Sequence, residues 1–318
     1  MMILRSIADL AEIEGSIHAA IGVFDGVHLG HRAVIECARE SAQATGGGAC
    51  VITFDPHPVR VLAPNDAPRL LTATDHKLQL LSEIGITHTA VIPFDEEFAE
   101  TSAEDFVRQL HQHSRSLARI CVGADWRFGR RGAGNVSLLE KMGADLGFSV
   151  TGVPTISIDR MVASSTRIRE AVAGGDFGIA ERLLGRPYTV LGTVITGRQL
   201  GRELGFPTAN LSVHSEQLPP TGVYAVSVSG EGRDQMPGVA NLGYRPSVEG
   251  EGSKRLLEVH LFDWSGDLYG HDLEVRFVEF LRSELKFDSL EALKRQIAED
   301  SNHARRKLGL PGSGSVSG

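Results

Sequence analysis

Residues 21–35 constrain the fold of this chain more than any other stretch of its sequence. An apolar, strand-like run ends at Val23, a turn follows at Asp25 and Gly26, and a helical spacing of apolar residues starts near Leu29. A strand, a glycine turn and a helix start, in this order, make half of a nucleotide-binding α/β unit. The sequence therefore predicts a ligand site where this helix begins.

Two histidines, His28 and His31, lie at the start of the expected helix, three positions apart and so near one face. The first-turn amides and the helix dipole already favour a phosphate there, and imidazoles add directed donors. Such donors suit a phosphoryl centre under in-line attack. A metal pair and a purely structural pair remain alternatives, although a metal would need further ligands at short spacing. The three cysteines, Cys37, Cys50 and Cys121, are scattered and form no CxxC motif.

Composition and charge narrow the classes of protein to which the chain can belong. Its 318 residues are enough for two domains of ordinary size. A net charge of −8 argues against nucleic-acid and anionic-membrane partners, and no apolar run approaches the ~20 residues of a membrane helix. Early acidic residues argue against a secretory signal, and the scattered cysteines fit a reducing compartment, so a cytoplasmic location is expected. A weak homo-oligomer stays open.

Strands and helices alternate through the first half of the chain. Continuously apolar stretches such as 49–54 are typical of strands buried on both faces of a parallel sheet, and Ser102 opens a capping box for the next helix. Right-handed crossovers between such strands give a doubly wound parallel sheet. The expected strands are 18–24, 49–54, 89–93, 119–123 and 148–153, and the expected helices include 29–45, 74–84 and 136–146.

Polar residues follow two of these expected strands. Asp55 and His57 stand in a proline-stiffened loop after residues 49–54, and Asp125 lies in a loop rich in glycine and arginine after residues 119–123. Ligands of open α/β sheets bind outside the carboxyl ends of the strands, so these residues are site candidates. A rigid turn and a charged surface loop are the alternatives.

Four further candidates, Ser164, Ser165, Thr166 and Arg167, open a later helix. Their hydroxyls can cap the helix or bind phosphate oxygens, and Arg167 can make a forked contact with a triphosphate. A plain helix cap with solvated arginines is the alternative.

The pattern changes near residue 185, where short strands begin to alternate with glycine turns at the spacing of a small antiparallel β-barrel. We expect an α/β domain at 1–184, a barrel domain at 185–308 and a flexible tail at 309–318. The expected strands are 188–196, 222–229, 238–242, 256–262 and 273–280, and a helix at 289–307 closes the domain.

The most specific run in the second half spans residues 197–210. Its glycines, Gly197, Gly201 and Gly205, are spaced by four and could bring backbone amides onto a phosphate, although the run is not a Walker A loop. After Pro207, Thr208 supplies a hydroxyl and Asn210 a carbonyl oxygen, which are hard ligands suited to Mg²⁺. A glycine-rich barrel turn is the alternative.

The strand expected at 256–262 alternates, with leucines and valine on one face and Glu258 and His260 on the other. Glu258 is then a carboxylate on a rigid strand, where a general base could be placed. A solvated, outward Glu258 is the alternative, and His260 is expected to be structural.

Several motifs together resemble one protein family. The stretch Gly22–His31 has the form GxFDGxHxGH and resembles the adenylyltransferase half of the prokaryotic bifunctional riboflavin kinase/FMN adenylyltransferases, or FAD synthetases. The runs at 53–58, 123–129 and 164–169 resemble the later motifs of that half, with Trp126 where phenylalanine is usual. The run LGFPTAN, at 204–210, resembles the riboflavin kinase signature.

Weaker matches place further residues in the flavin or nucleotide sites of this family. Asn241 and Arg245 fall in a turn resembling NxGxRPT, with Ser247 for threonine, and Arg282 falls in a segment that covers the flavin in the family. The resemblance implies binding roles for Gly22, Phe24, Asp25, Gly30, Asp55, His57, Asp125, Ser164, Ser165, Thr166, Arg167, Gly197, Gly201, Gly205, Pro207, Asn241, Arg245 and Arg282.

The resemblance also implies two reactions. The barrel would phosphorylate riboflavin with ATP and Mg²⁺ to give FMN, and the α/β domain would join FMN to the AMP part of a second ATP, giving FAD and pyrophosphate. His28 and His31 would hold the α-phosphate, and Glu258 would be the kinase base. Two rival hypotheses are nucleotidyl transfer to another phosphate, such as a phosphopantetheine or a polyol phosphate, and a flavin-binding sensor without catalysis.

Overall fold

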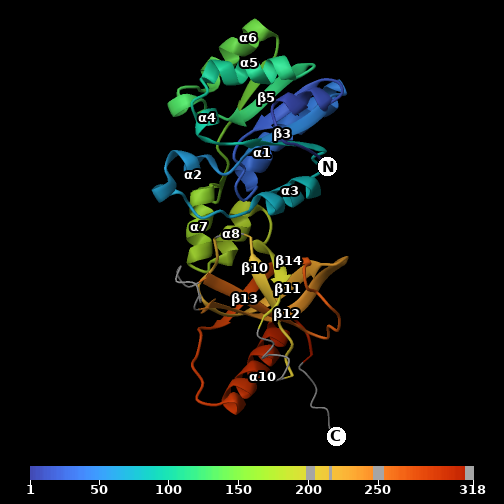
Figure 1. Cartoon of the computed structure of the whole chain (residues 1–318), viewed down its shortest axis with the longest axis vertical. Coiled ribbons are helices and arrows are strands. Elements are labelled where there is room, and N and C mark those ends of the chain that lie inside the picture. Colours follow the sequence, from blue (N-terminus) through green and yellow to red (C-terminus); the bar gives the residue numbers. More distant parts are fainter. Residues whose placement is uncertain (198–204, 215–216, 246–253, 312–318) are drawn as a thin grey trace. The chain divides into compact units, whose positions relative to one another are not determined.

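The computed structural model describes residues 1–197, 205–214, 217–245 and 254–311 (Figure 1). The chain forms two compact units. The first contains Met1–Leu70, Thr74–Arg167 and Leu183–Gly185, and the second contains Leu71–Ala73, Ile168–Arg182 and Arg186–Gly318. The segment Ile168–Arg182, which the sequence assigns to the first domain, thus clusters with the second unit. The exact domain boundary at residue 184 stays a prediction.

The first unit is built on a six-stranded, fully parallel sheet. Its strand order is β1-β4-β3-β2-β5-β6, so the chain winds outward in both directions from the centre, and the predicted doubly wound sheet is confirmed. The edge strand β1 was not predicted. The strands are β1 (Met2–Leu4), β2 (Ile17–Ile21), β3 (Gly48–Asp55), β4 (His88–Pro93), β5 (Leu117–Gly123) and β6 (Ser149–Val153).

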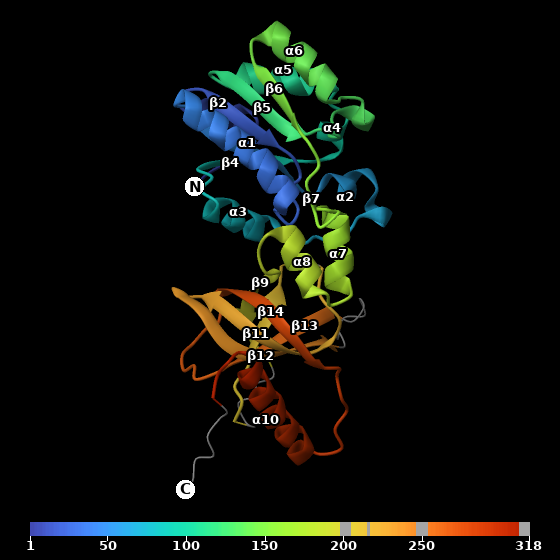
Figure 2. The same ribbon diagram turned by 180° about the vertical axis from the view of Figure 1, so that it is seen from behind.

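Helices cover both faces of this sheet (Figures 1 and 2). Ala20 of β2 faces the core that includes residues of α1 (Leu29–Thr45) and α3 (Thr74–Glu83). Ala19 and Ile21 face the other core, with α5 (Ala103–His113) and α6 (Val136–Leu146). The apolar strands seen in the sequence are therefore buried on both sides. The short elements are η1 (Ala8–Glu12), α2 (Pro58–Leu62), η2 (Pro64–Asp66), α4 (Glu96–Ala99), η3 (Arg130–Gly132), β7 (Ser157–Ile158) and β8 (Met161–Val162).

Local sequence signals set the helix ends. Gly46 ends α1 with a left-handed φ of 72°, as expected for a glycine at this position. The predicted capping box at Ser102 is confirmed, because its Oγ accepts the N–H of Asp105 at 3.0 Å and also donates to the Asp105 carboxylate at 2.7 Å.

The second unit is a closed antiparallel barrel of six strands in the order β10-β13-β12-β11-β14-β9. The sequence predicts five of these strands and misses β10, which carries Asn210. The helix α10 (Leu290–Lys307) packs against the barrel, where Ala304 joins a core with Val223, Val239 and Phe262 (Figure 1). The strands are β9 (Thr189–Ile195), β10 (Ala209–Val213), β11 (Gly222–Gly230), β12 (Arg233–Arg245), β13 (Lys254–Leu261) and β14 (Asp272–Arg282).

Two helices precede the barrel in sequence, α7 (Ser165–Ala173) and α8 (Phe177–Leu184). The ring of Phe177 stacks on Phe277 of β14, with centroids 5.7 Å apart and an interplanar angle of 8°. It also meets Tyr224 at 6.1 Å. These aromatic contacts explain why the chain after Arg167 clusters with the barrel.

Candidate active sites

The candidate residues of the first unit gather at one edge of its sheet. The strands β3, β2 and β5 are neighbours and run parallel, so their carboxyl ends lie together. The backbone N–H of Gly22, just after β2, donates to the carbonyl of Ile52 at 3.1 Å. The loops that follow these three strands therefore share the edge at which α/β sheets bind ligands.

His28 and His31 form a stacked pair at the start of α1. Their ring centroids are 3.5 Å apart, with an interplanar angle of 21°. His28 is also the N-cap of the helix, since its Nδ1 accepts the backbone N–H of His31 at 3.3 Å. In the neutral His28 ring, this bond places the proton on Nε2. The imidazole therefore satisfies one of the amides in the first turn of the helix.

The start of α7 is tied to the same loop. The Ser165 hydroxyl donates to the carbonyl of Asp25 at 2.9 Å, and Ser164 Oγ accepts the N–H of Arg167 at 3.4 Å. Gly30 fits a narrow space there, because a Cβ at this position would lie 3.1 Å from Cε1 of His28 and 3.2 Å from the carbonyl oxygen of Ala163. The structure thus brings the two predicted phosphate-binding groups together, with Thr166 and the neighbouring arginine exposed.

Asp55 and Asp125 are exposed at the ends of β3 and β5. His57 caps the short helix α2, where its Nδ1 accepts the N–H of Val59 at 3.2 Å. Its neutral ring therefore also carries its proton on Nε2. The roles predicted for these side chains stay predictions.

An aromatic cavity of about 230 Å³, which the sequence did not predict, lies beside these loops. The rings of Trp126 and Phe128 stack at its wall with centroids 4.7 Å apart. Its aromatic lining comes from the ends of β3, β4 and β5 and from α4 and α5, so only the fold assembles it. The repeated phenylalanines at 94 and 98 were the available sequence signal. The aromatic residues of the lining are Phe54, Phe94, Phe98, Phe106, Trp126 and Phe128.

In the barrel, three predicted residues lie in one row across adjacent strands. Glu258 of β13 is the register partner of Asn210 on β10 and of Asn241 on β12. Directly opposed residues of antiparallel strands project on the same face. All three line a cavity of about 460 Å³, together with Thr208. A carboxylate, two carboxamides and a hydroxyl therefore converge on one space.

A second barrel cavity, of about 590 Å³, is lined by Trp264 and Tyr269 among others. Thr208 lines both this cavity and the first one. His260 holds the turn that precedes Thr208, because its Nδ1 donates to the carbonyl of Pro207 at 2.8 Å. Burial lowers the pKa of the His260 imidazole. The residue expected to be structural thus supports the predicted metal-binding turn.

Two glycines of the 197–210 run are explained by different structural constraints, one steric and one conformational. A Cβ on Gly197 would lie 2.1 Å from Nδ2 of Asn210, so the carboxamide needs a bare backbone beside it. Gly205 has a left-handed φ of 85°. Gly201 and Ser247 lie outside the described residues, and Arg245 ends β12.

The donor set around Asn210 fits a hard cation. Its Oδ1 is buried and has no hydrogen-bond partner in the described part of the chain. A buried carbonyl oxygen without a donor is costly unless a ligand or ion completes it. Within the same described residues, no cluster of three or more histidine, cysteine or carboxylate side chains could hold a metal ion. This composition suits an ion that arrives with substrate phosphates and keeps some of its waters.

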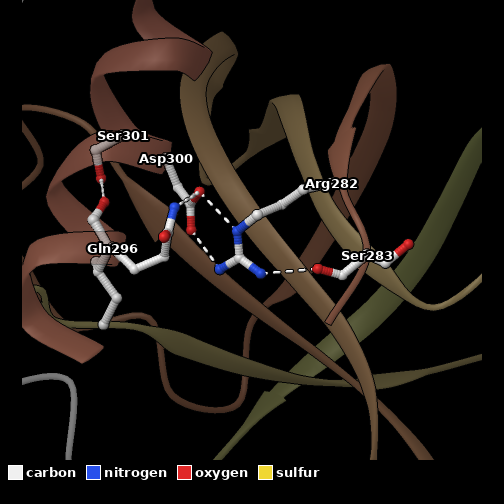
Figure 3. A network of polar contacts seen from close by, with 6 residues as sticks. Arg282, Ser283, Gln296, Asp300 and Ser301 are labelled. Carbon is white, nitrogen blue, oxygen red and sulfur yellow. Dashed lines mark hydrogen bonds and ion pairs between the residues drawn. The ribbon is translucent and has the colours of Figure 1, made fainter. Parts of the chain in front are cut away.

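Arg282 lies at the wall of the 460 Å³ cavity but is held by an ion pair (Figure 3). Its Nε and Nη2 donate to the two carboxylate oxygens of Asp300 on α10, at 2.8 and 2.6 Å. Gln296 donates to the same carboxylate at 3.1 Å. The guanidinium therefore fixes α10 over the cavity, and direct flavin contact by Arg282 stays a prediction.

The chain matches two family models. Residues 11–167 match the model described as FAD synthetase, and residues 184–308 match the one described as riboflavin kinase. The protein of Escherichia coli (strain K12) named bifunctional riboflavin kinase/FMN adenylyltransferase is 39% identical over 312 residues, covering 98% of this chain and 99% of that protein. This chain belongs to the bifunctional riboflavin kinase/FMN adenylyltransferase family. The resemblance seen in the motifs is confirmed.

Two further comparisons show similarity over nearly the whole chain. The protein of that name in Pseudomonas fluorescens is 40% identical, covering 96% of this chain and 97% of its own. A crystal structure from Streptococcus pneumoniae, titled a macrolide-efflux protein, superimposes with a TM-score of 0.78 at 28% identity, covering 94% of this chain and 96% of that one. Within the described residues, the helices are too short or too polar to span a bilayer.

Proposed function

We propose that this chain makes both flavin cofactors in two steps, at two separate sites. The barrel phosphorylates riboflavin with ATP to give FMN and ADP. The α/β unit then transfers AMP from a second ATP to FMN, giving FAD and pyrophosphate. The observation that carries the proposal is that each unit has a candidate site of its own. Each site lies within one compact unit and has its own chemistry.

In the kinase reaction, Glu258 is the general base. Its carboxylate takes the proton of the terminal ribityl hydroxyl as the oxygen attacks the γ-phosphorus, and ADP leaves. The strand holds Glu258 between Asn210 and Asn241, so the base needs no reorganisation. Thr208 and Asn210 are the residues that would hold Mg²⁺, since they present hydroxyl and carbonyl oxygens. The bound ion would neutralise charge on the phosphates.

The two barrel cavities divide the reactants. The 460 Å³ cavity contains Glu258 and therefore takes riboflavin, with α10 and Arg282 at its wall. The 590 Å³ cavity takes the nucleotide, and Trp264 and Tyr269 offer faces for its base. Because Thr208 lines both cavities, the phosphoryl group passes beside it.

Adenylyl transfer needs no general base, because the FMN phosphate is already ionised and is itself the nucleophile. It attacks the α-phosphorus of ATP, and pyrophosphate leaves. Catalysis then consists of positioning and charge stabilisation. His28 and His31 bind the α-phosphate, and the group at the start of α7 binds the outer phosphates: Ser164, Ser165, Thr166 and Arg167. The aromatic cavity accepts the isoalloxazine ring by stacking.

We also propose small-molecule reactants only, without nucleic-acid or membrane partners, for a chain of net charge −8. Mg²⁺ as the ion, a cytoplasmic location and a weak homo-oligomer belong to the same proposal. Equilibrium dialysis with radiolabelled nucleic acid and sedimentation velocity over a range of concentrations would test the partner and assembly statements.

The decisive experiment assays each half reaction in two variants. Glu258→Ala is expected to abolish FMN formation from riboflavin while FAD formation from supplied FMN continues. His31→Ala is expected to do the reverse. Products are separated by chromatography after incubation of riboflavin or FMN with ATP and Mg²⁺. Loss of both steps from one substitution, in protein that melts like wild type, would refute the two-site proposal. Tight flavin binding with no product in the unmodified chain would favour a sensor.

A further inference from the structure

Lys77 of α3 is a buried cation at the edge of the sheet. Lys77 is only 4% exposed to solvent. Its Nζ donates to the carbonyl of Val23 at 3.0 Å and to Oγ1 of Thr53 at 3.1 Å. The Thr53 hydroxyl in turn donates to the same Val23 carbonyl at 2.9 Å. An ammonium, a hydroxyl and a carbonyl therefore close a triangle that joins α3, β3 and the loop after β2.

A lysine in this position is costly, because the charged form loses its hydration. Burial lowers the pKa of Lys77 to about 8, although the Asp25 and Asp55 carboxylates oppose the shift. The amine is still mostly protonated at neutral pH. Replacing a buried charge by an apolar side chain of similar length often preserves or raises stability. Stability therefore does not explain why a lysine is present at this position. Its hydrogen bond to Val23, in the loop after β2, explains it better.

The carbonyl held by this triangle belongs to the residue before a strained turn. Phe24 has a φ of 52° and Val27 a φ of 41°, both in the left-handed region that residues with a Cβ avoid. Such conformations persist only where the surrounding structure holds them. The Val23 carbonyl, bonded by two donors, fixes the peptide that enters this turn, and the Val27 N–H closes it on the Phe24 carbonyl at 3.2 Å.

The turn fixes an aromatic ring against a candidate catalytic histidine. Phe24 is 2% exposed, and its ring edge meets the His31 ring with centroids 5.3 Å apart and an interplanar angle of 88°. A Cβ on Gly22 would lie 3.0 Å from the same phenyl ring, so the ring fills its space tightly. Contacts therefore run without a break from Lys77 through Val23 and Phe24 to His31.

We propose that Lys77 is a positioning residue for adenylyl transfer. With Thr53, its ammonium holds the Val23 carbonyl, the strained turn places Phe24, and the phenyl edge sets the orientation of His31. The inference rests on the role given to His31 under the proposed function.

The test combines Lys77→Met with His31→Asn in single and double variants of the full chain. Methionine matches the length of lysine but donates no hydrogen bond. We expect Lys77→Met to lower kcat for FAD formation from FMN about 10- to 100-fold, the usual cost of a small misplacement, with KM for FMN within about threefold. Its melting temperature should equal or exceed that of wild type, and riboflavin phosphorylation should be unchanged. In the His31→Asn background, Lys77→Met should cause little further loss.

Three outcomes separate the possible failures. A wild-type kcat in Lys77→Met would overturn the inference, as would the same loss of rate repeated in the His31→Asn background. Wild-type FAD formation in His31→Asn alone would instead remove the proposed role of His31 itself. If Lys77→Met fails to fold, Thr53→Val replaces it. We expect that variant to lower kcat several-fold and Thr53→Ser to restore it, whereas equal rates in the two would overturn the inference.

Discussion

Gly197→Ala offers a sharp test of the barrel site, because it adds one methyl group beside Asn210. The new Cβ would lie 2.1 Å from Nδ2 of Asn210, and restoring an ordinary contact of 3.4 Å would move the carboxamide by about 1.3 Å. The strand cannot retreat, since β10 is paired on both sides with β9 and β13. A displacement of this size at the oxygen proposed to bind Mg²⁺ is expected to cost about 100-fold in rate, or about 2.7 kcal/mol of transition-state stabilisation.

The assay follows FMN formation from riboflavin across a range of Mg²⁺ concentrations. We expect kcat/KM to fall about 100-fold and half-saturation to require more Mg²⁺, while FAD formation from supplied FMN keeps its wild-type rate. Gly178→Ala is the matched control in the same unit. Its Cβ would lie 3.5 Å from the nearest atom, Oδ1 of Asp176, and it replaces a glycine within the helix α8. This control should keep both activities and melt at or above the wild-type temperature.

Two results would refute this reasoning. Wild-type kinase kinetics in Gly197→Ala at every Mg²⁺ concentration would mean that the position of the Asn210 carboxamide is irrelevant to the reaction. An equal loss of both activities would mean that the methyl group disturbs the whole chain rather than one side chain.

Three further predictions follow from buried groups and close contacts. The pKa of Lys77 is about 8 in the folded protein, against 10.5 for a free lysine. Between these pH values the unfolded chain binds more protons than the folded one, so the free energy of unfolding rises with pH. Lys77 therefore lowers the free energy of unfolding by about 3 kcal/mol below pH 8 and by progressively less up to pH 10.5. Lys77→Met should therefore raise the free energy of unfolding most at pH 7, and a constant difference up to pH 10.5 in urea titrations would contradict this. Asp300→Ala leaves a largely buried Arg282 without its partner and should destabilise the barrel by about 3 kcal/mol in denaturant titrations, whereas a change under about 0.5 kcal/mol would mean a solvated pair. Gly30→Ala crowds His28 and should slow FAD formation at least about tenfold while FMN formation continues, and unchanged FAD kinetics would show that the ring has room to move.

The periodic part of the fold could be predicted from the sequence, and the short elements could not. The helix at 29–45 matches α1 because a clear helical spacing and a terminal glycine mark both ends. The edge strand Met2–Leu4 has three residues and pairs with the distant residues 88–90, so no local sequence pattern distinguishes it from a loop. The strand Ala209–Val213 was not predicted, because it overlaps the glycine-rich motif at 197–210. The strands with which it pairs, β9 and β13, are separate segments of the chain.

The candidate sites divide in the same way. Motif residues such as His28 and Glu258 could be selected because their spacing and chemistry are local properties of the sequence. The aromatic cavity could not, since its rings come from separate loops and only the sheet brings them together. Lys77 was also missed, because a lysine on an amphipathic helix normally faces solvent, and its burial depends on the turn at Val23.

Thr208 is a lining residue of both barrel cavities. Other lining residues differ between the cavities, with Glu258 and Arg282 in one and Trp264 and Tyr269 in the other. If riboflavin occupies the first cavity and the nucleotide the second, as proposed, substitutions in the lining of one cavity would change the preference for one reactant without altering that for the other. The same barrel could then accept an analogue of either reactant, provided that Thr208 is kept.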